Sequence, residues 1–205
     1  MKIISPSFEL ESVCGDEILR KIERAGRVCY KSEDKITETS AQKFVAVLIK
    51  HGHESVLEHA QITARVVCDR GVTHEIVRHR LASYSQESTR YCNYAKGAFG
   101  SELTFIKPCF WADDSAMMDT WKVTMAAIET QYLKLMSSGA TPEQARSILP
   151  NSLKTEIVMS MNLRAWRHFF RLRTNAASHP QMREIANMML EGFRAAVPVV
   201  FDDIG

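Results

Sequence analysis

The feature that most constrains the fold is a change in the period of the apolar residues along the chain. Between residues 15 and 51, apolar side chains recur at helical spacing, as at Ile18, Ile22 and Ala25. From His59 to Asp69 apolar and polar residues alternate instead, which is typical of a half-buried strand. Helical spacing then returns. Because helices and strands are mixed without a regular alternation, the pattern predicts an α+β fold, with helices around a small antiparallel sheet.

Capping residues and breakers place the expected elements. We expect a long helix over Asp113 to Ser137, capped near Asp113 or Asp114 and ended by Gly139, and a short helix capped by Thr141. The remaining helices are expected at residues 15–30, 40–51, 72–80, 163–174 and 180–197, and the strands at 3–10, 59–69 and 153–161. No repeat, linker or low-complexity tract separates these elements. We therefore expect a single domain over residues 1–205.

Composition excludes several classes of protein. The net charge of +2 is low for a chain that holds nucleic acid over its whole surface, so we expect no nucleic-acid partner. The five cysteines form no CxxC pair, which indicates reduced thiols rather than a disulfide framework or a zinc knuckle. No stretch approaches the ~20 apolar residues of a membrane span, and no signal-like segment opens the chain. We expect a soluble, cytoplasmic protein without a membrane partner.

The first segment that carries chemistry begins at Arg78-His79-Arg80 and continues through a run of hydroxyl and amide side chains to Tyr91. Guanidinium forks and hydroxyl groups are suited to a phosphate and a polar heterocycle. We expect the three cationic residues to lie on a helix, where successive side chains point ~100° apart, so that they serve two ligands rather than one phosphate. Taken alone, an RHR triplet also fits a solvated basic turn.

The second segment runs from Asn162 to Arg183, and no acidic residue lies between Glu156 and Glu184. On a helical projection, a polar stripe consists of Arg164, Arg167, His168 and Arg171, and the opposite, apolar stripe consists of Trp166, Phe169 and Phe170. Arg173 falls with the aromatic residues. Because an unpaired buried charge is costly, Arg173 requires a partner, which is either a structural carboxylate or a ligand. We expect the aromatic residues to belong to the core.

The third segment, His51 to His59, is dense in histidine and glutamate. A metal site is the alternative to a helix end with a polar loop. The segment lacks the HExxH order, because no histidine precedes Glu58-His59 at the required offset, and it has no cysteine partner. We therefore expect the helix end and loop, and no metal.

Together these residues resemble the flavin-dependent thymidylate synthase family. The family signature is RHR, seven residues and Ser, which corresponds here to Arg78-His79-Arg80 through Ser88. The similarity extends through SYSQESTRY and includes the HGHES-xx-EH block upstream and the ARxxLP and NLR segments downstream. It covers most of the chain from about Cys29 onward, and an ordered set of motifs of this length is far more specific than an isolated RHR.

The resemblance implies a role for each matching position. The positions that match flavin-binding residues of the family are Ser55, Arg78, His79, Arg80, Gln86, Asn162, Leu163, Arg164 and His168. The positions that match dUMP-binding residues are Glu75, Arg78, Gln86, Glu87, Ser88, Thr89, Arg90, Arg146 and Arg173. Arg173 is implied as the catalytic residue, which activates the uracil ring by stabilising its ionised form. His53 and Glu58 match positions near the flavin.

The implied activity is reductive methylation of dUMP to dTMP. In the family, 5,10-methylenetetrahydrofolate is the carbon donor and FAD, reduced by NADPH or NADH, is the reductant. Family members are homotetramers with FAD sites shared between subunits, which agrees with the absence of a GxGxxG loop from this sequence. The sequence departs from some members at Glu75, Gln86 and His168, where they carry Gln, Glu and Asn. Because these exchanges keep hydrogen-bonding ability, they affect individual contacts to the ligands rather than the implied activity.

Two other classes of function compete with this interpretation. The arginine-rich helix and its aromatic residues also fit a nucleotide- or RNA-binding module. The histidine- and glutamate-rich segment would fit a metal-dependent hydrolase. Bound flavin in the purified protein distinguishes the enzyme from the binding module, and elemental analysis tests for the hydrolase.

Overall fold

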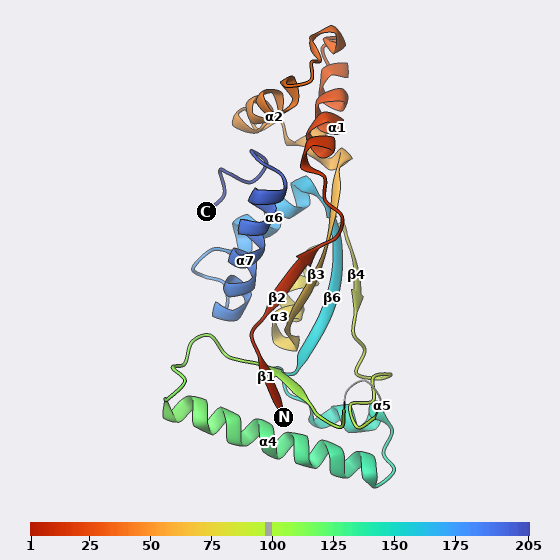
Figure 1. Ribbon diagram of the computed structural model, residues 1–205, viewed down its shortest axis with the longest axis vertical. Helices are drawn as coiled ribbons and strands as arrows, with labels where there is room; N and C mark the ends of the chain where they lie inside the picture. The colour runs from red at the N-terminus through yellow and green to blue at the C-terminus, as the bar shows by residue number, and fades with distance from the viewer. Residues whose placement is uncertain (97–99) are drawn as a thin grey trace. The chain divides into compact units, whose positions relative to one another are not determined.

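The computed structural model describes residues 1–96 and 100–205 (Figure 1). The chain forms two compact units. The first comprises Met1–Ser7, Val66–Arg78 and Ser85–Ile157, and the second comprises Phe8–Arg65, His79–Tyr84 and Val158–Gly205. The expectation that residues 1–205 act as a single domain stays a prediction.

The strands confirm the α+β class with a small antiparallel sheet. Four strands pair in the order β2-β3-β6-β4, and their bounds are Ser7–Leu10 for β2, Gln61–Asp69 for β3, Lys154–Asn162 for β6 and Ala82–Gln86 for β4. Burial alternates along β3 and β6, as the two-residue period of a half-buried strand requires. A separate parallel pair joins β1 (Lys2–Ile4) to β5 (Thr104–Ile106), with Lys2 opposite Thr104.

The first unit packs its helices around an aromatic core. Its helical elements are α3 (Arg70–Ile76), α4 (Ala116–Ser137), α5 (Pro142–Ala145) and the 3-10 turn η4 (Arg146–Ile148). α4 begins later than expected because Ser115, rather than Asp113, caps it and accepts a hydrogen bond from the Met118 N–H at 3.2 Å. The expected cap at Thr141 is confirmed as a reciprocal capping box with Gln144. The core includes Phe105, Trp121 and Tyr132.

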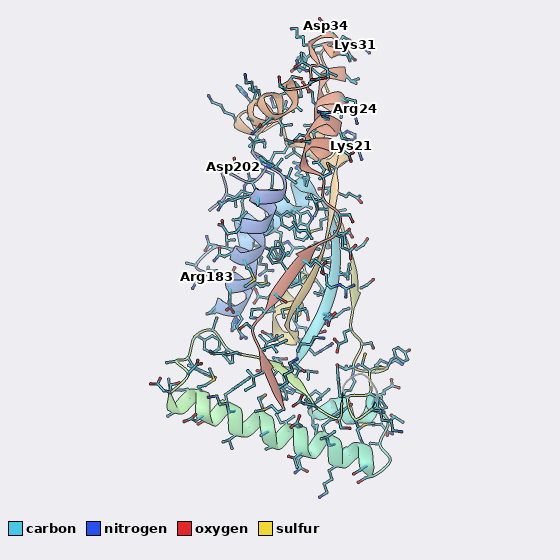
Figure 2. All side chains as sticks on the ribbon, viewed as in Figure 1. Lys21, Arg24, Lys31, Asp34, Arg183 and Asp202 are labelled. Atoms are coloured by element: carbon cyan, nitrogen blue, oxygen red, sulfur yellow. The ribbon has the colours of Figure 1, made fainter. Side chains whose placement is uncertain are left out.

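The second unit contains the remaining helices. Its elements are α1 (Gly15–Val28), η1 (Glu33–Lys35), α2 (Ser40–Lys50), η2 (Glu54–His59), α6 (Leu163–Arg173) and α7 (Pro180–Ala196). The α6 aromatics are core residues, as expected: Trp166 and Phe170 lie in ring contact with Phe193 of α7, and the two helices pack side by side (Figure 1). The solvent side of α1 carries charged residues such as Lys21 and Arg24 (Figure 2).

Several expected bounds are wrong for local physical reasons. The strand expected at residues 3–10 is divided into β1 and β2, since Pro6 between them has no N–H to donate. The helix expected at residues 72–80 begins at Arg70, because the Asp69 carboxylate accepts the Val72 N–H at 2.8 Å, and it ends at Ile76. β4, β5 and η2 were not anticipated from the sequence.

A membrane-spanning helix would need a long, apolar segment. Within residues 1–96 and 100–205, no helix is both long and apolar enough to cross a membrane.

Candidate functional site

The RHR segment is not helical. α3 ends at Ile76, and Arg78, His79 and Arg80 occupy the irregular connection to β4. The expectation that helical geometry separates their side chains by ~100° is therefore wrong. Arg78 and Arg80 are exposed, whereas His79 is only 7% exposed. Leu81, which follows directly, has a φ of +61°, a conformation that residues other than glycine rarely adopt and that concentrates at functional sites.

His79 and Arg173 form a direct pair in the second unit. The Arg173 Nε donates to the His79 Nε2 at 2.9 Å. Burial, then the charge of Arg173, then His168 lower the pKa of His79 to about 4, so its imidazole is neutral near pH 7. The Phe169 ring packs edge-on against the His79 ring at 4.9 Å, and the Tyr84 hydroxyl donates to the His79 carbonyl oxygen at 2.7 Å. A neutral acceptor orients the guanidinium without neutralising its charge.

Arg167 is a buried arginine whose charge is paired with carboxylates, although the helical projection assigns it to the polar stripe. Arg167 is fully buried, and its Nη1 and Nη2 donate to Asp203 at 2.7 Å each. Its Nε donates to Glu54 at 3.0 Å, and its Nη1 also donates to the Val200 carbonyl oxygen. The projection was wrong at this position because the C-terminal segment covers that side of α6. Arg171 is exposed and also bonds Glu54, at 2.9 Å.

The other predicted flavin residues of the second unit surround the start of α6. Asn162 caps the helix, because its side-chain oxygen accepts the Ala165 N–H at 2.8 Å. The exposed Arg164 pairs with Glu58 at 2.6 Å. The expected helix end in the third segment is confirmed, since α2 ends at Lys50, but the 3-10 helix η2 takes the place of the expected loop. Ser55 in η2 and His53 directly before it are exposed. Leu163 is fully buried, and its N–H donates to the Ala60 carbonyl oxygen at 3.0 Å.

The predicted nucleotide residues, apart from Arg173, lie in the first unit. Gln86 ends β4, and its Nε2 donates to Thr73 at 3.1 Å and to Thr155 at 3.2 Å. Glu87 follows, and both of its carboxylate oxygens accept hydrogen bonds, from Tyr94 and from Lys154. Both carboxylate oxygens of Glu87 are therefore already bonded to other residues of the chain.

The turn after Glu87 carries the predicted phosphate-binding groups. The Tyr91 and Cys92 N–H groups both donate to the Ser88 carbonyl oxygen, and the Ser88 Oγ accepts the Arg90 N–H at 3.3 Å. The Arg90 Nε pairs with Glu143 of α5 at 2.9 Å. The remaining predicted nucleotide residues of this unit are the half-buried Glu75 on α3, the exposed Arg78, the buried Thr89 and the exposed Arg146 of η4.

Two of the cysteines keep their protons near pH 7. Burial and the nearby Glu87 raise the pKa of Cys92, and burial raises that of Cys68 beyond its ordinary range, so both are thiols rather than thiolates near pH 7. Among the residues that the structure describes, no group of three or more His, Cys, Asp or Glu side chains could hold a metal ion.

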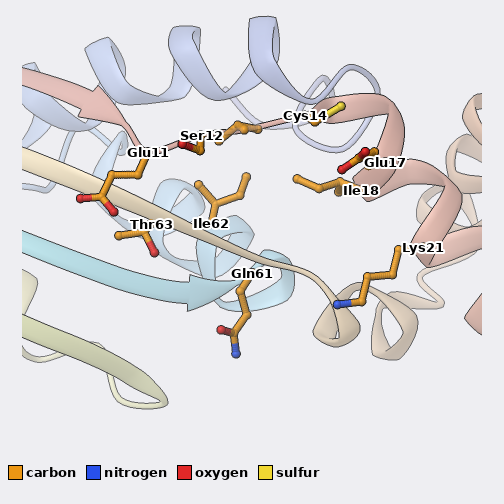
Figure 3. Close-up of a pocket in the computed structure, with 10 residues that line it drawn as sticks. Glu11, Ser12, Cys14, Glu17, Ile18, Lys21, Gln61, Ile62 and Thr63 are labelled. Carbon is orange, nitrogen blue, oxygen red and sulfur yellow. The ribbon is translucent and has the colours of Figure 1, made fainter.

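Two hollows were not anticipated from the sequence. One, of about 390 Å³, lies in the second unit and is lined by Glu17 and Lys21 of α1 and by Ile62 of β3, among others (Figure 3). The other, also of about 390 Å³, lies in the first unit against α4 and is lined by Trp111, Met117 and Trp121 among others. Neither lining contains a predicted flavin or nucleotide residue.

Comparison with known proteins links this set of residues to one family. A family model described as thymidylate synthase complementing protein matches residues 14–199. A flavin-dependent thymidylate synthase of Pyrococcus furiosus is 39% identical over 162 residues, which cover 78% of this chain and 66% of that protein. The Geobacter sulfurreducens flavin-dependent thymidylate synthase is 32% identical over 188 residues, covering 88% of this chain and 79% of the other.

Similarity also extends to a solved structure. The UMP/dUMP methylase PolB from Streptomyces cacaoi, bound with 5-Br dUMP, superposes with a TM-score of 0.77 at 26% identity and covers 98% of this chain. The chain spans slightly less than two thirds, 66%, of the length of its Pyrococcus furiosus and Pyrococcus abyssi relatives.

Proposed function

Because the chain belongs to the thymidylate synthase complementing protein family, whose relatives include flavin-dependent thymidylate synthases, we propose that it methylates dUMP to dTMP with FAD as cofactor. The observation that carries the proposal is the hydrogen bond from Arg173 to the neutral His79, which belongs to the family signature. A cation whose direction is fixed beside a binding site stabilises negative charge that develops on a ligand.

The donor set of the second unit fits FAD. Arg80 and Arg164 are exposed cations, and Asn162 caps the 11-residue helix α6, whose N-terminus favours an anion. This combination suits a diphosphate, and the exposed Ser55 adds a hydroxyl group. We assign flavin binding to these residues and to Arg78, His79, Gln86, Leu163 and His168. When bound, FAD supplies the reducing equivalent that the new methyl group requires, after its own reduction by NADPH or NADH.

The first unit supplies groups for the nucleotide phosphate. Arg90, Arg146 and the hydroxyl of Ser88 offer charge-assisted hydrogen bonds to a phosphate dianion. The Arg90–Glu143 pair is exposed on both sides, at 50% and 59%, so a phosphate displaces Glu143 at little cost. Glu75, Arg78, Gln86 and Thr89 complete the proposed dUMP set.

Arg173 has the proposed catalytic role. Methylation at C5 of uracil requires electron density at that carbon, and a cation beside the ring carbonyl stabilises the ionised ring that provides it. His79 fixes the direction of the guanidinium through the Nε bond. The substrate carbon then attacks the methylene group of 5,10-methylenetetrahydrofolate, the bond from that group to the folate nitrogen breaks, and C5 loses its proton. The hydride that completes the methyl group would come from reduced FAD.

We propose that no residue of the protein bonds covalently to C6 of dUMP. The raised pKa of Cys92 keeps its thiol protonated. The Ser88 Oγ accepts a backbone N–H, and its sequence neighbours include the cation Arg90 rather than a histidine base. We further propose a cytoplasmic homotetramer with shared FAD sites, as in the family.

Two measurements on the full chain test this function. An absorbance spectrum of freshly purified protein should show bound flavin, with peaks that an RNA-binding module or a metal-dependent hydrolase would lack. Oxidation of the NADPH-reduced protein in the presence of methylenetetrahydrofolate should then depend on dUMP. Protein that remains colourless after addition of FAD, and that neither binds nor converts dUMP, would exclude the proposed function.

A further inference from the structure

Glu87 lies at the junction between β4 and the turn that carries the proposed phosphate-binding groups. Its N–H donates to the Glu156 carbonyl oxygen of β6 at 2.9 Å, and its own carbonyl oxygen accepts from the Arg70 Nη1 at 3.3 Å. The main chain is thus bonded on both sides immediately before Ser88. These two hydrogen bonds fix the position of the backbone from which residues 88–90 continue.

The Glu87 side chain closes the turn. Its Oε1 accepts the Tyr94 hydroxyl at 2.6 Å, which joins the first and last residues of the segment 87–94. Tyr94 is 4% exposed and packs into the aromatic core of the first unit, so its hydroxyl is a fixed donor. Burial and then Glu87 raise the pKa of Tyr94 above its ordinary range, and the hydroxyl keeps its proton.

Lys154 provides the countercharge. Its Nζ donates to the Glu87 Oε2 at 2.8 Å and to Glu156 at 2.5 Å. Burial disfavours the ammonium, but the two carboxylates outweigh it and raise the pKa of Lys154. The Glu87 and Lys154 side chains are only 11% and 17% exposed, so solvent screens this pair less than it screens an exposed one.

We propose that Glu87 is a positioning residue. Its hydrogen bonds to Tyr94 and Lys154, which we call the Glu87 lock, hold the turn of residues 87–94 in one conformation, so that Ser88 and Arg90 are already placed to bind the nucleotide phosphate. This inference rests on the proposed function. A preformed turn lowers the ordering cost of binding, so its loss weakens substrate binding more than it slows the chemical step. Glu87 acts on the substrate through its neighbours rather than by direct side-chain contact.

The test compares Glu87→Gln and Tyr94→Phe with the unaltered enzyme. Glu87→Gln neutralises the carboxylate that accepts both hydrogen bonds of the lock, whereas Tyr94→Phe removes only the bond from the Tyr94 hydroxyl. Both substitutions keep the size of the side chain. We expect the KM for dUMP to rise by roughly tenfold, which is the lower range for such a bond, while kcat changes by less than about threefold. FAD absorbance should be unchanged. In a Glu87→Gln background, Tyr94→Phe should add little, because both changes release the same turn.

Tyr132→Phe is the matched control. Tyr132 is fully buried in the same core, and its ring lies 6.0 Å from that of Tyr94, but its hydroxyl makes no hydrogen bond to Glu87 or Lys154. We expect its KM for dUMP to equal that of the unaltered enzyme. A purely structural role predicts instead that both tyrosine variants raise KM alike.

Three results would overturn the inference. One is an unchanged KM in Tyr94→Phe, which remains decisive if Glu87→Gln does not fold. Another is a loss confined to kcat, which would indicate a direct chemical role for Glu87. The third is unaltered enzyme that binds FAD but no dUMP. This last result would refute the proposed function as well, whereas the first two leave it intact.

Discussion

Replacement of Arg167 by Met should destabilise the second unit strongly without touching the proposed site residues. Met keeps much of the apolar stem of Arg167 but removes its hydrogen bonds to Glu54, Asp203 and Val200. Breaking a buried ion pair typically costs 3–5 kcal/mol. Asp203 is 47% exposed and Glu54 keeps its bond to Arg171, so we expect the lower end, about 3 kcal/mol. For a chain of this size, that corresponds to a fall in Tm of roughly 6–12 °C.

Urea denaturation at pH 7 provides the measurement, and Arg171→Met provides the control. Arg171 also bonds Glu54, but it is 47% exposed, and an exposed pair contributes about 1 kcal/mol or less. Because Arg167 is buried and Arg171 is exposed, we expect a large loss in the free energy of unfolding for Arg167→Met and a small one for Arg171→Met. Equal losses in the two variants would refute the role assigned to burial.

The same cluster predicts the direction of a pH dependence. The Arg167 hydrogen bond lowers the pKa of Asp203, and the two arginines, acting against burial, lower that of Glu54. The unfolded state therefore binds protons more readily, and the stabilisation is present above the ordinary values of 3.8 and 4.5 and is lost as pH falls below them. Denaturation between pH 3 and 7 should show a smaller acid-induced loss for Arg167→Met than for the unaltered protein.

Three further predictions concern the proposed site. Arg173→Ala should keep FAD bound but lose turnover by about a hundredfold or more, as measured at saturating dUMP, and wild-type turnover would contradict its catalytic role. Glu143→Gln should lower the KM for dUMP by up to about fivefold, since it frees Arg90 from an exposed pair, and a higher KM would contradict this competition. Cys92→Ala should be nearly silent, and a dUMP adduct in the intact-mass spectrum that disappears in this variant would overturn the non-covalent mechanism.

Local periodicity and capping were sufficient to predict most elements of the fold. The alternation in β3 and the Thr141 cap depend on neighbouring residues only, and both are confirmed. β4 was missed because its residues, Ala82–Gln86, include no large apolar residue apart from Tyr84 and resemble a polar loop. Its pairing with β6 is a long-range contact that a single sequence does not reveal.

The arginines of α6 illustrate the same limit within the candidate site. The projection correctly separated the aromatic stripe, but it could not show that the C-terminal segment carrying Asp203 covers Arg167. The partner of Arg173 was left open between a carboxylate and a ligand, and the structure adds a neutral histidine from the signature itself. The Glu87 lock joins residues 87, 94 and 154, whose separation along the chain conceals it from motif analysis.

The most direct test of the central claim is the formation of dTMP. Purified full-length chain should be incubated with dUMP, 5,10-methylenetetrahydrofolate, NADPH and FAD, and the nucleotides should be separated by liquid chromatography. We expect dTMP that accumulates over many turnovers, requires FAD and disappears in Arg173→Ala. Equal dTMP formation when FAD is omitted from flavin-free protein, or no dTMP from protein shown to bind both FAD and dUMP, would contradict it.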